Sequence, residues 1–436
     1  MNTRQKLLVT ATFFAAAHTL FDAQICKGQL NFEGPPINYH HATPTDAMGQ
    51  LIQEIESGKK SLSYSPEHGW LPSLLEHLEI PVESQLLVFS KTSLQLHKIS
   101  PRTPRALYFN DDIYVGWCQR GDVLEIAATD DRLGAVFYTL DQNQSESPRF
   151  ARDRGGCLTC HASHRTQGVP GFVVRSVYPD FNGRPRGGTR TYVGDHTTEF
   201  KNRFGGWYLT GSLGEFNHMG NAIAKDRSDP EKLDRSDQGD RDSLSGLCNT
   251  APYLRDDSDI VSLLVLEHQT QMHNLITRAH QETLIATYYD RGINKALGRP
   301  LDTVSPSTHR RIDKAAENLV RYMLFIDEEP LPNPVAGSSD FRQAFERSSL
   351  RRPDQKDRDL RQLDLTERLF VYPCSYLIYS RAFDALPPQV GNVVRDRLQA
   401  ILNGSPDDDG FISLSRDDRQ AIWEILQETK PGYFEA

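Results

Sequence analysis

Two cysteines and a histidine lie together in the stretch "CLTCH", which runs from Cys157 to His161. Covalent haem attachment requires this spacing, because two thiols three residues apart can reach the two vinyl groups of one porphyrin. The histidine that follows directly is then available as the proximal ligand of the iron. The spacing therefore predicts one covalent haem c, with Cys157 and Cys160 as anchors and His161 on the iron.

Three other interpretations of these residues stay open at the level of sequence. A redox disulfide of thioredoxin type would also use Cys157 and Cys160, but it does not need the histidine. A zinc site could combine both cysteines with His164, although no second pair of ligands completes it. The third is chance occurrence of the pentapeptide. The remaining cysteines stand alone at wide separations, at positions 26, 118, 248 and 374.

The N-terminus has the pattern of a secretory signal peptide. Arg4 and Lys6 precede an apolar run from Leu7 to about Phe21, and this order of charge and apolar run is typical of such signals. We expect residues 1–25 to be a signal peptide and the mature protein to be periplasmic or otherwise exported; the alternative is a buried first helix. Export agrees with the haem prediction, because covalent haem attachment takes place outside the cytoplasm.

Composition argues against a nucleic-acid partner and against a membrane-spanning segment. The chain has 436 residues, of which 49 are basic and 58 acidic, for a net charge of -9. The basic residues are scattered rather than gathered into a stripe, so nucleic acid is not expected as a partner. No stretch after the N-terminus reaches the roughly 18 apolar residues that a membrane span needs, so we expect no span in the mature chain.

The elements that must position the motif follow from the spacing of apolar residues. Short aromatic and β-branched runs between residues 86 and 140, broken by turn residues, predict antiparallel strands at "LLVFS", "LQLHK", "RALYF", "DIYVGWC", "DVLEIAA" and "AVFYTL". Two short helices are expected before them, and Asn110 to Asp112 are interpreted as a local turn. Glycine-rich loops after the motif contain strand-like pieces at 172–178 and 207–210.

The C-terminal part has helical periodicity. A helix of about eight turns begins after Ser258 or Asp259 as N-cap, and further helices are expected at 307–328, 365–384, 389–403 and 415–429. The sequence thus predicts an α+β fold. Its expected parts are a signal peptide (1–25), a β-rich domain with short leading helices (26–150), a haem c attachment region (151–225), a charged loop or linker (226–257) and a helical domain (258–436).

The sixth ligand of the iron has several candidates. Met219 is the first choice, because it follows the motif in a glycine-rich loop and methionine is a usual axial ligand in cytochromes. Its alternatives are His218, and His268, Met272 and His273 on the long helix, or no protein ligand at all. Arginines between the motif and Met219 could bind haem propionates; they are Arg175, Arg184, Arg186 and Arg190.

The pentapeptide resembles the attachment site of c-type cytochromes, which implies thioethers at Cys157 and Cys160 and ligation by His161. Most of the chain after about residue 85 also resembles a group of large, exported, single-haem bacterial proteins named only as cytochrome c domain-containing. The segments that carry this resemblance include "RALYFNDDIYVGW", "GAVFYTLDQ", "GGWYLTG", "LVLEHQTQMHNLITRA" and "YPCSYLIYS". The resemblance brings no established reaction beyond the three haem residues.

The expected function is single-electron transfer to a redox partner protein. A bare electron carrier needs only about 100 residues, one ordinary domain, so the length of this chain keeps two alternatives open. One is a haem c enzyme, a peroxidase or small-molecule oxidase with an open distal site. The other is a haem-based redox sensor or docking module.

Overall fold

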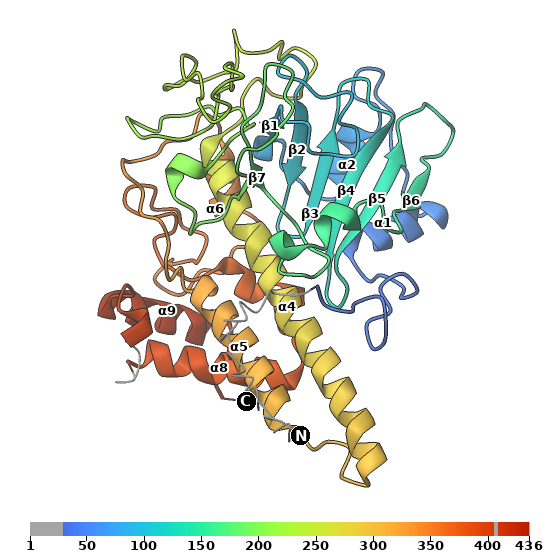
Figure 1. The fold of residues 1–436 in the computed structure, drawn as a ribbon, viewed down its shortest axis with the longest axis vertical. Coiled ribbons are helices and arrows are strands. Elements are labelled where there is room, and N and C mark those ends of the chain that lie inside the picture. The colour runs from blue at the N-terminus through green and yellow to red at the C-terminus, as the bar shows by residue number, and fades with distance from the viewer. Residues whose placement is uncertain (1–28, 405–408, 436) are drawn as a thin grey trace, which may run out of the picture.

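The predicted strands form one antiparallel sheet in which neighbours in the chain are neighbours in the sheet (Figure 1). The computed structural model describes residues 29–404 and 409–435, so the predicted signal peptide lies outside the described residues. The strands are β1 (Leu86–Val88), β2 (Arg105–Phe109), β3 (Ile113–Trp117), β4 (Val123–Asp130), β5 (Gly134–Asp141) and β6 (Phe150–Arg152). The predicted strand "LQLHK" is wrong, because Leu94 and Leu96 lie in an exposed turn instead.

The register of the strands separates two faces of the sheet. Leu107 pairs with Gly116, Gly116 with Glu125, and Glu125 with Thr139, so these four residues share one face. Their chain neighbours point to the opposite face and are buried apolar residues. That apolar face is built from Ala106, Tyr108, Val115, Trp117, Leu124, Ile126, Tyr138 and Leu140.

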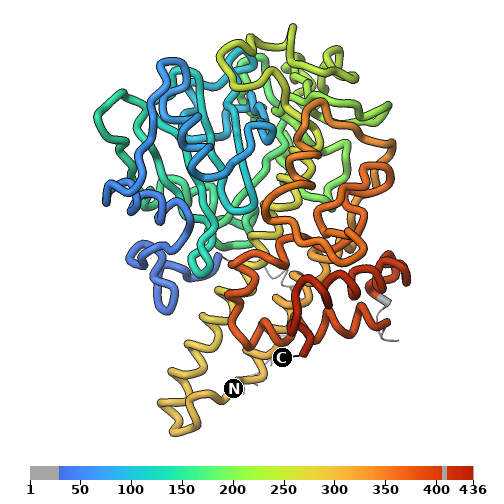
Figure 2. Tube along the Cα trace, turned by 180° about the vertical axis from the view of Figure 1, so that it is seen from behind, coloured from blue at the N-terminus to red at the C-terminus, as the bar shows by residue number. Residues whose placement is uncertain are grey.

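The leading helices α1 (Ala47–Glu56) and α2 (Leu71–His77) belong to the apolar face of the sheet (Figure 2). Asp46 is the N-cap of α1, and its carboxylate accepts the backbone N–H of Gly49 (2.9 Å). The same carboxylate accepts the hydroxyl of Tyr138 on β5 (2.7 Å). The Asp46 carboxylate therefore pairs a backbone N–H at the start of α1 and the hydroxyl of Tyr138 at the same time. It caps the helix and joins it to the sheet.

A single long helix, α4 (Ile260–Leu297), joins the sheet region to the helical region (Figure 1). It begins at the predicted N-cap Asp259, whose carboxylate accepts the N–H of Val261 (2.8 Å). It ends at Gly298, which has φ of +64° and closes the last turn in the left-handed conformation. Its 38 residues correspond to about 57 Å of helix. Nearly every residue from Ile260 to Ala286 is buried, so this part of α4 is enclosed on all sides.

The C-terminal helices pack beside α4. They are α5 (Pro306–Met323), α6 (Phe341–Glu346), α7 (Arg381–Asp384), α8 (Pro388–Leu402) and α9 (Arg416–Thr429). The prediction of one helix over 365–384 is wrong. Pro373 lacks the N–H that a helix interior needs, and the side chains of Ser375 and Ser380 cap two separate short pieces, a 3-10 turn at Tyr376–Tyr379 and then α7.

Short elements and loops complete the chain between β6 and α4. They include α3 (Leu158–His161), a two-stranded ribbon of β7 (Arg175–Ser176) and β8 (Tyr192–Val193), and 3-10 turns at His164–Thr166 and Phe200–Asn202. Two further 3-10 turns lie elsewhere, Val82–Ser84 before β1 and Asp409–Phe411 before α9. The predicted strand at 207–210 is present only as isolated bridges. The predicted charged loop 226–257 has no regular helix or strand.

One continuous apolar cluster joins the sheet, α4 and the C-terminal helices. The fold class is therefore α+β, as predicted, with its parts packed on a shared core. A buried ion pair lies inside that core: the Arg203 guanidinium, 3% exposed, donates to the Glu267 carboxylate of α4, 0% exposed, at 2.8 Å. No helix among the described residues is long and apolar enough to cross a membrane.

The first prediction concerns His280, which is buried on α4. Burial, and then the nearby Arg132, lower the pKa of His280 to about 4, whereas a histidine in the unfolded chain titrates near 6.5. Below that pH the unfolded chain binds a proton that the folded protein does not. The contribution of His280 to the free energy of unfolding is thus kept above pH 6.5 and falls by roughly 2 kcal/mol on going to pH 5.

Urea unfolding of the protein and of His280→Gln at pH 8, 6.5 and 5 checks this expectation. Glutamine does not titrate, so the variant should lose less stability on acidification than the unaltered protein does. Equal losses in both proteins would show that His280 is protonated without cost in the fold.

Candidate functional site

The two cysteines of the predicted haem motif lie on one turn of helix. α3 begins directly after Cys157, and the carboxylate of Asp153 accepts the backbone N–H groups of Gly155 (3.0 Å) and Cys157 (2.9 Å). Residues three apart in a helix share a face, so both thiols are presented on one side. The Cys157 thiol is partly buried, the Cys160 thiol is exposed, and neither forms a disulfide.

The environment of Cys157 opposes thiolate chemistry. Burial raises the pKa of its thiol to about 12, and the carboxylates of Asp153 and Glu125 add to the effect. The thiol therefore carries its proton at neutral pH. A thioredoxin-type cysteine needs the opposite, a lowered pKa that supplies a thiolate nucleophile. This environment argues against the redox-disulfide interpretation of the motif.

The imidazole of His161 is held in one orientation by a backbone carbonyl. Its Nδ1 atom lies 3.0 Å from the carbonyl oxygen of Gly171, and because a carbonyl can only accept, Nδ1 must carry the proton. The N–H of Gly171 donates back to the carbonyl of His161 (2.8 Å), and the ring of Phe137 on β5 packs at 4.9 Å. Burial of the ring lowers the pKa of His161.

This bond determines which nitrogen of His161 can bind a metal. With the proton on Nδ1, the lone pair of the neutral ring is on Nε2, which makes no hydrogen bond to any residue that the structure describes. Metal-ligating histidines commonly donate their other N–H to a carbonyl or carboxylate, because this fixes the tautomer and raises the basicity of the ligating nitrogen. The His161–Gly171 pair has this arrangement.

The carbonyl of Gly171 is itself positioned by α4 and the sheet. Asn274 of α4 accepts the backbone N–H of Phe172 (2.8 Å) and donates to its carbonyl (2.8 Å). On the other side, Ala135 of β5 donates to the carbonyl of Pro170 (3.0 Å). A Cβ on Gly171 would lie 2.2 Å from the Asn274 side-chain oxygen, so only glycine allows this approach.

A charged pair lies on the face of the sheet beside the motif. Arg105 of β2 and Glu125 of β4 are 2.9 Å apart, both largely buried, and the guanidinium covers Gly116 of β3. The Nε of Arg105 is buried without a hydrogen-bond partner. Both side chains affect the pKa values of Cys157 and His161. The ring of Phe137, which lies on the same face of the sheet as Glu125, contacts the ring of His161, so this face lies next to the motif.

Two arginines that form no ion pair with a described residue lie within electrostatic reach of Cys160. The Arg175 side chain makes no hydrogen bond or ion pair with any described residue, and its Nε is buried. Burial, and then the positive charge of Arg165, lower the pKa of Arg175, whereas Cys160 opposes this effect. Arg165 has no counter-ion among the described residues either. An unpaired cationic pair at this point fits an anionic group, and the propionates of a haem have matching chemistry.

The other arginines considered for that role lie elsewhere. Arg186 donates to the carbonyl of Ala224 (2.8 Å), and Arg184 and Arg190 are exposed. Of the four, Arg175 is therefore the one that the structure brings to the motif.

Met219 faces away from the motif. It is buried in a small cluster with Tyr178 and Ala224, and its sulfur accepts the hydroxyl of Ser176 at 3.6 Å. Ser176 and Arg175 are neighbours in β7 and so point to opposite faces, and it is Arg175 that lies near Cys160. Ligation of the iron by Met219 stays a prediction, but its sulfur is on the far side of this strand.

The remaining sixth-ligand candidates each have partners of their own. His218 accepts the N–H of Gly220 through Nδ1 (3.1 Å). On α4, His268 bonds through Nε2 to Ser375 (2.8 Å) and through Nδ1 to His196 (2.9 Å). The last two are Met272, fully buried in the core, and His273, which donates to the carbonyl of Asp111 (2.7 Å). Among the described residues, none of them has a hydrogen bond or ring contact with the cysteine motif.

The residues that sequence reasoning missed are the ones that orient His161. Gly171 lies 10 positions after His161 in the chain and Asn274 lies 113 positions after it, so no local spacing joins them to His161. Asn274 carried little signal of its own, because the helical stretch around it, 267–277, is rich in polar residues. A buried amide must find partners, and this one finds the backbone that presents Gly171.

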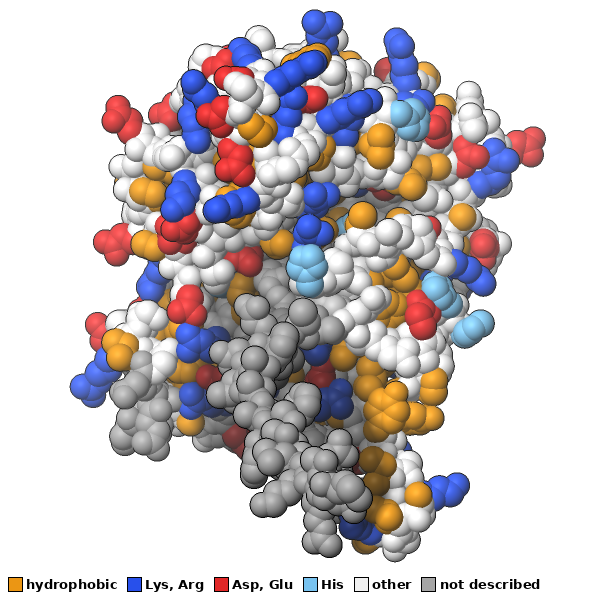
Figure 3. Space-filling model, in the orientation of Figure 1, with side chains coloured by type: hydrophobic (Ala, Val, Ile, Leu, Met, Phe, Trp, Pro, Cys, Tyr) orange, Lys and Arg blue, Asp and Glu red, His pale blue; other side chains and the backbone are white. Residues whose placement is uncertain are grey.

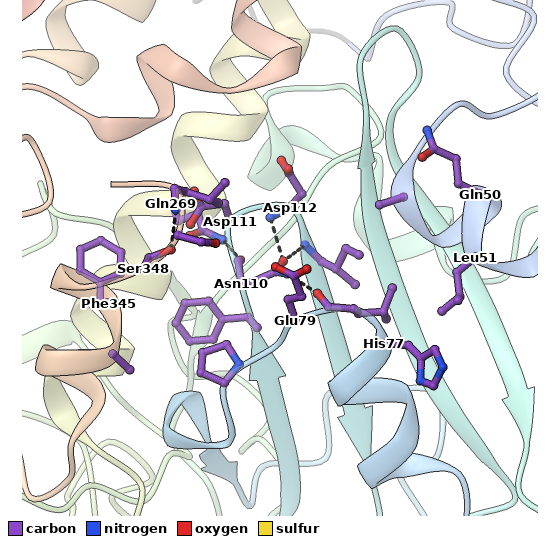
Figure 4. A pocket seen from close by; sticks show the side chains of 18 of the residues that line it. Gln50, Leu51, His77, Glu79, Asn110, Asp111, Asp112, Gln269, Phe345 and Ser348 are labelled. Carbon is purple, nitrogen blue, oxygen red and sulfur yellow. Dashed lines mark hydrogen bonds between the residues drawn. The ribbon is translucent and has the colours of Figure 1, made fainter. Parts of the chain in front are cut away.

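A separate cavity of about 410 Å³ lies between α1, α2, α6 and the turn from β2 to β3 (Figure 4). The turn is the predicted one: the Asn110 side chain accepts the N–H groups of Asp112 (3.1 Å) and Ile113 (2.9 Å). Burial raises the pKa of Asp112, which lines the cavity, to about 7. None of the lining residues belongs to the segment 153–176, so this cavity is distinct from the cysteine motif.

Comparison with known proteins assigns no family to the chain. No protein-family model, curated protein or solved structure matches this chain. Within residues 29–404 and 409–435, no group of three or more His, Cys, Asp and Glu side chains is placed to hold a metal ion.

The second prediction tests the role of Asn274. In Asn274→Ala, the backbone N–H and carbonyl of Phe172 lose their partners in a buried place, which should lower the free energy of unfolding by roughly 2–4 kcal/mol. Amide hydrogen exchange at Gly171 and Phe172 should become faster, because the loop is no longer held to α4. Urea unfolding and exchange measured by NMR check both effects.

Asn294→Ala is the matched control on the same helix. Asn294 holds the carbonyl of Thr303 (2.7 Å) at the far end of α4, so its loss should leave exchange at Gly171 and Phe172 unchanged. If Asn274→Ala leaves this exchange as slow as the control does, then α4 does not position the acceptor of His161.

Proposed function

We propose that this chain is an exported c-type cytochrome, in which one covalent haem exchanges single electrons with a redox partner protein. The observation that carries the proposal is the bond from His161 to the carbonyl of Gly171. This bond leaves Nε2 of His161 without a hydrogen bond to any described residue. His161 directly follows Cys160, whose free thiol lies on the same helical turn as that of Cys157. The haem would supply a one-electron iron couple.

The residues of this chain have distinct parts in the proposal. The thiols of Cys157 and Cys160 would each add across one vinyl group of the haem, sulfur to one carbon and hydrogen to the other, so that no external oxidant would be consumed. His161 would offer Nε2 to the iron while Gly171 holds its Nδ1 proton. Arg175 and Arg165 supply positive charge without a counter-ion, which suits propionate groups. The orientation of the His161 ring is thus set by the protein alone.

A second function is supported by the positions of the candidate sixth ligands. Met219 lies behind β7, and His218, His268 and His273 are bonded to other residues. An iron bound only by His161 would keep an open distal position, as a haem c enzyme or a haem-based sensor requires. The two proposals share the haem and differ at the sixth ligand.

The third prediction tests the haem itself. The protein should be expressed with its own N-terminus in a bacterial host that attaches haem c. We expect it to keep haem through denaturing electrophoresis, and Cys157→Ala/Cys160→Ala to lose it. Cys118→Ala, at a buried cysteine away from the motif, is the control that should keep the haem. Covalent haem in the double variant would overturn the proposed attachment.

The fourth prediction tests the sixth ligand. Because the sulfur of Met219 is engaged with Ser176 on the far side of β7, Met219→Ala should leave the absorption spectrum and the reduction potential unchanged. Carbon monoxide separates the two functions: a ferrous protein that binds it has the open distal position of an enzyme or a sensor. A six-coordinate low-spin iron that rejects carbon monoxide, and whose spectrum changes in Met219→Ala, would instead establish Met219 as the ligand and simple electron transfer as the function.

A further inference from the structure

The cavity beside the turn from β2 to β3 has the size of a small-molecule site. Its volume is about 410 Å³, and pockets that bind small molecules typically have roughly 300–1,000 Å³. Figure 4 shows Glu79 and Asp112 near its middle, between Phe345 of α6 on one side and Leu51 of α1 on the other. Glu79 and Leu350 line the cavity and are exposed, so a ligand can enter it from solvent.

Apolar side chains form part of the cavity wall. The rings of Phe109, Phe341 and Phe345 make a continuous aromatic surface, because the ring centroids of Phe109 and Phe341 are 5.8 Å apart and those of Phe341 and Phe345 are also 5.8 Å apart. Leu51 and Leu78 line the cavity from α1 and from the end of α2. A wall of this kind favours a ligand with a flat apolar body.

The charges that line the cavity do not balance. Four of the lining side chains are acidic and two are basic, and each basic side chain pairs with one acidic side chain. Glu79 and Asp112 are left without a counter-ion among the described residues. On the face of the molecule drawn in Figure 3, acidic and basic side chains are interspersed instead. The pairs in the cavity wall are Lys60 with Glu54 (2.9 Å) and Arg361 with Asp111.

The fold makes no use of the Asp112 carboxylate. The backbone of Asp112 belongs to the turn: its N–H donates to the Asn110 side chain (3.1 Å), and its carbonyl accepts the N–H of Thr129 (2.8 Å). The half-buried carboxylate itself accepts no hydrogen bond from any residue that the structure describes. A charge that is withdrawn from water without a partner costs free energy. The Asp112 carboxylate is thus available to a ligand.

The surroundings of Asp112 favour a positive charge on that ligand. Burial, and then the carboxylates of Asp111 and Asp131, raise the pKa of Asp112 to about 7, while Arg381 and Arg361 oppose the rise. Each of these arginines already pairs with one of the two acids. A cation placed against Asp112 would favour the ionised carboxylate and offset the repulsion from its acidic neighbours.

We propose that this cavity binds a small organic amine in its protonated form, with the ammonium group on the Asp112 carboxylate and the apolar body against Phe109 and Phe345. An ammonium group donates charge-assisted hydrogen bonds to a carboxylate, and these are stronger than hydrogen bonds between neutral groups. Glu79 adds negative charge at the exposed side of the cavity. The proposal does not depend on the haem, because no lining residue belongs to the segment that carries the cysteines.

Other kinds of ligand fit the cavity less well. Within residues 29–404 and 409–435, no group of three or more His, Cys, Asp and Glu side chains is placed to hold a metal ion. An anion would meet the unpaired Glu79 and Asp112, since both lining basic residues already have partners. A neutral apolar ligand would cover the Asp112 carboxylate without pairing it, which costs free energy. An organic cation matches both the apolar wall and the charge.

Binding of 2-phenylethylamine to the full-length, haem-loaded protein tests the proposal, with 2-phenylethanol as a neutral counterpart of similar shape. Ligand-observed NMR at pH 8 and low salt should give a Kd below about 1 mM for the amine, a value that its size allows. We expect the alcohol to bind at least tenfold more weakly, because it lacks the positive charge. An unchanged haem absorption spectrum separates this binding from ligation of the iron.

The pH dependence of binding tests the contact with Asp112. From pH 5.5 to 8.5 the affinity for the amine should rise roughly 30-fold, because Asp112, with a pKa of about 7, loses its proton while the amine keeps its charge. Asp112→Asn should remove most of this rise. His77 also lines the cavity, and His77→Gln should keep the rise, which separates the effect of Asp112 from that of the histidine.

Two matched pairs of variants locate the bound amine. Asp112→Asn should weaken binding at least tenfold, whereas Asp131→Asn, which removes a neighbouring charge outside the lining, should change it only slightly. Ala344→Phe, on the lining side of α6, should block the cavity, whereas Gln343→Phe, at an exposed position of the same helix, should not. Circular dichroism and urea unfolding should show that all four variants fold.

Four results would each overturn the proposal. The first is that the amine does not bind, and the second is that the alcohol binds as tightly as the amine. The third is that Asp112→Asn binds the amine as tightly as Asp131→Asn does. The fourth is that Ala344→Phe binds it as tightly as Gln343→Phe does, which would place the amine outside this cavity.

Discussion

The structure depends on the burial of one polar helix. Residues 260–286 of α4 are enclosed on all sides, and buried polar groups must be paired or they cost roughly 1–3 kcal/mol each. Many polar side chains of α4 meet this constraint by bonding to segments far away in the chain, although one atom each of Glu267, His273, His280 and Gln281 has no hydrogen-bond partner among the described residues. The bonded pairs are Glu267 with Arg203, His268 with Ser375, Gln269 with Asn110, His273 with Asp111, Asn274 with Phe172, and Gln281 with Leu133.

The need to pair the buried polar groups of α4 also fixes the candidate haem site, through a short series of hydrogen bonds. Asn274 holds the backbone of Phe172, this backbone presents the carbonyl of Gly171, and the carbonyl orients His161. The two bonds between Asn274 and Phe172 are buried, so a displaced loop would leave polar groups unpaired. The imidazole is therefore oriented before any ligand binds, which is the preorganisation that a metal-ligating histidine needs.

The sequence predicted the features that depend on neighbouring residues, and it missed those that depend on contacts between distant segments. The strands around Tyr108 and Ile126, the N-cap Asp259 and the α+β fold class follow from local periodicity and capping, and the structure confirms them. The false strand at 94–98 has the same alternation, but its leucines are not buried. The false helix over 365–384 ignored the missing N–H of Pro373. The acceptor of His161 depends on Asn274, more than 100 residues away, which no local pattern reports.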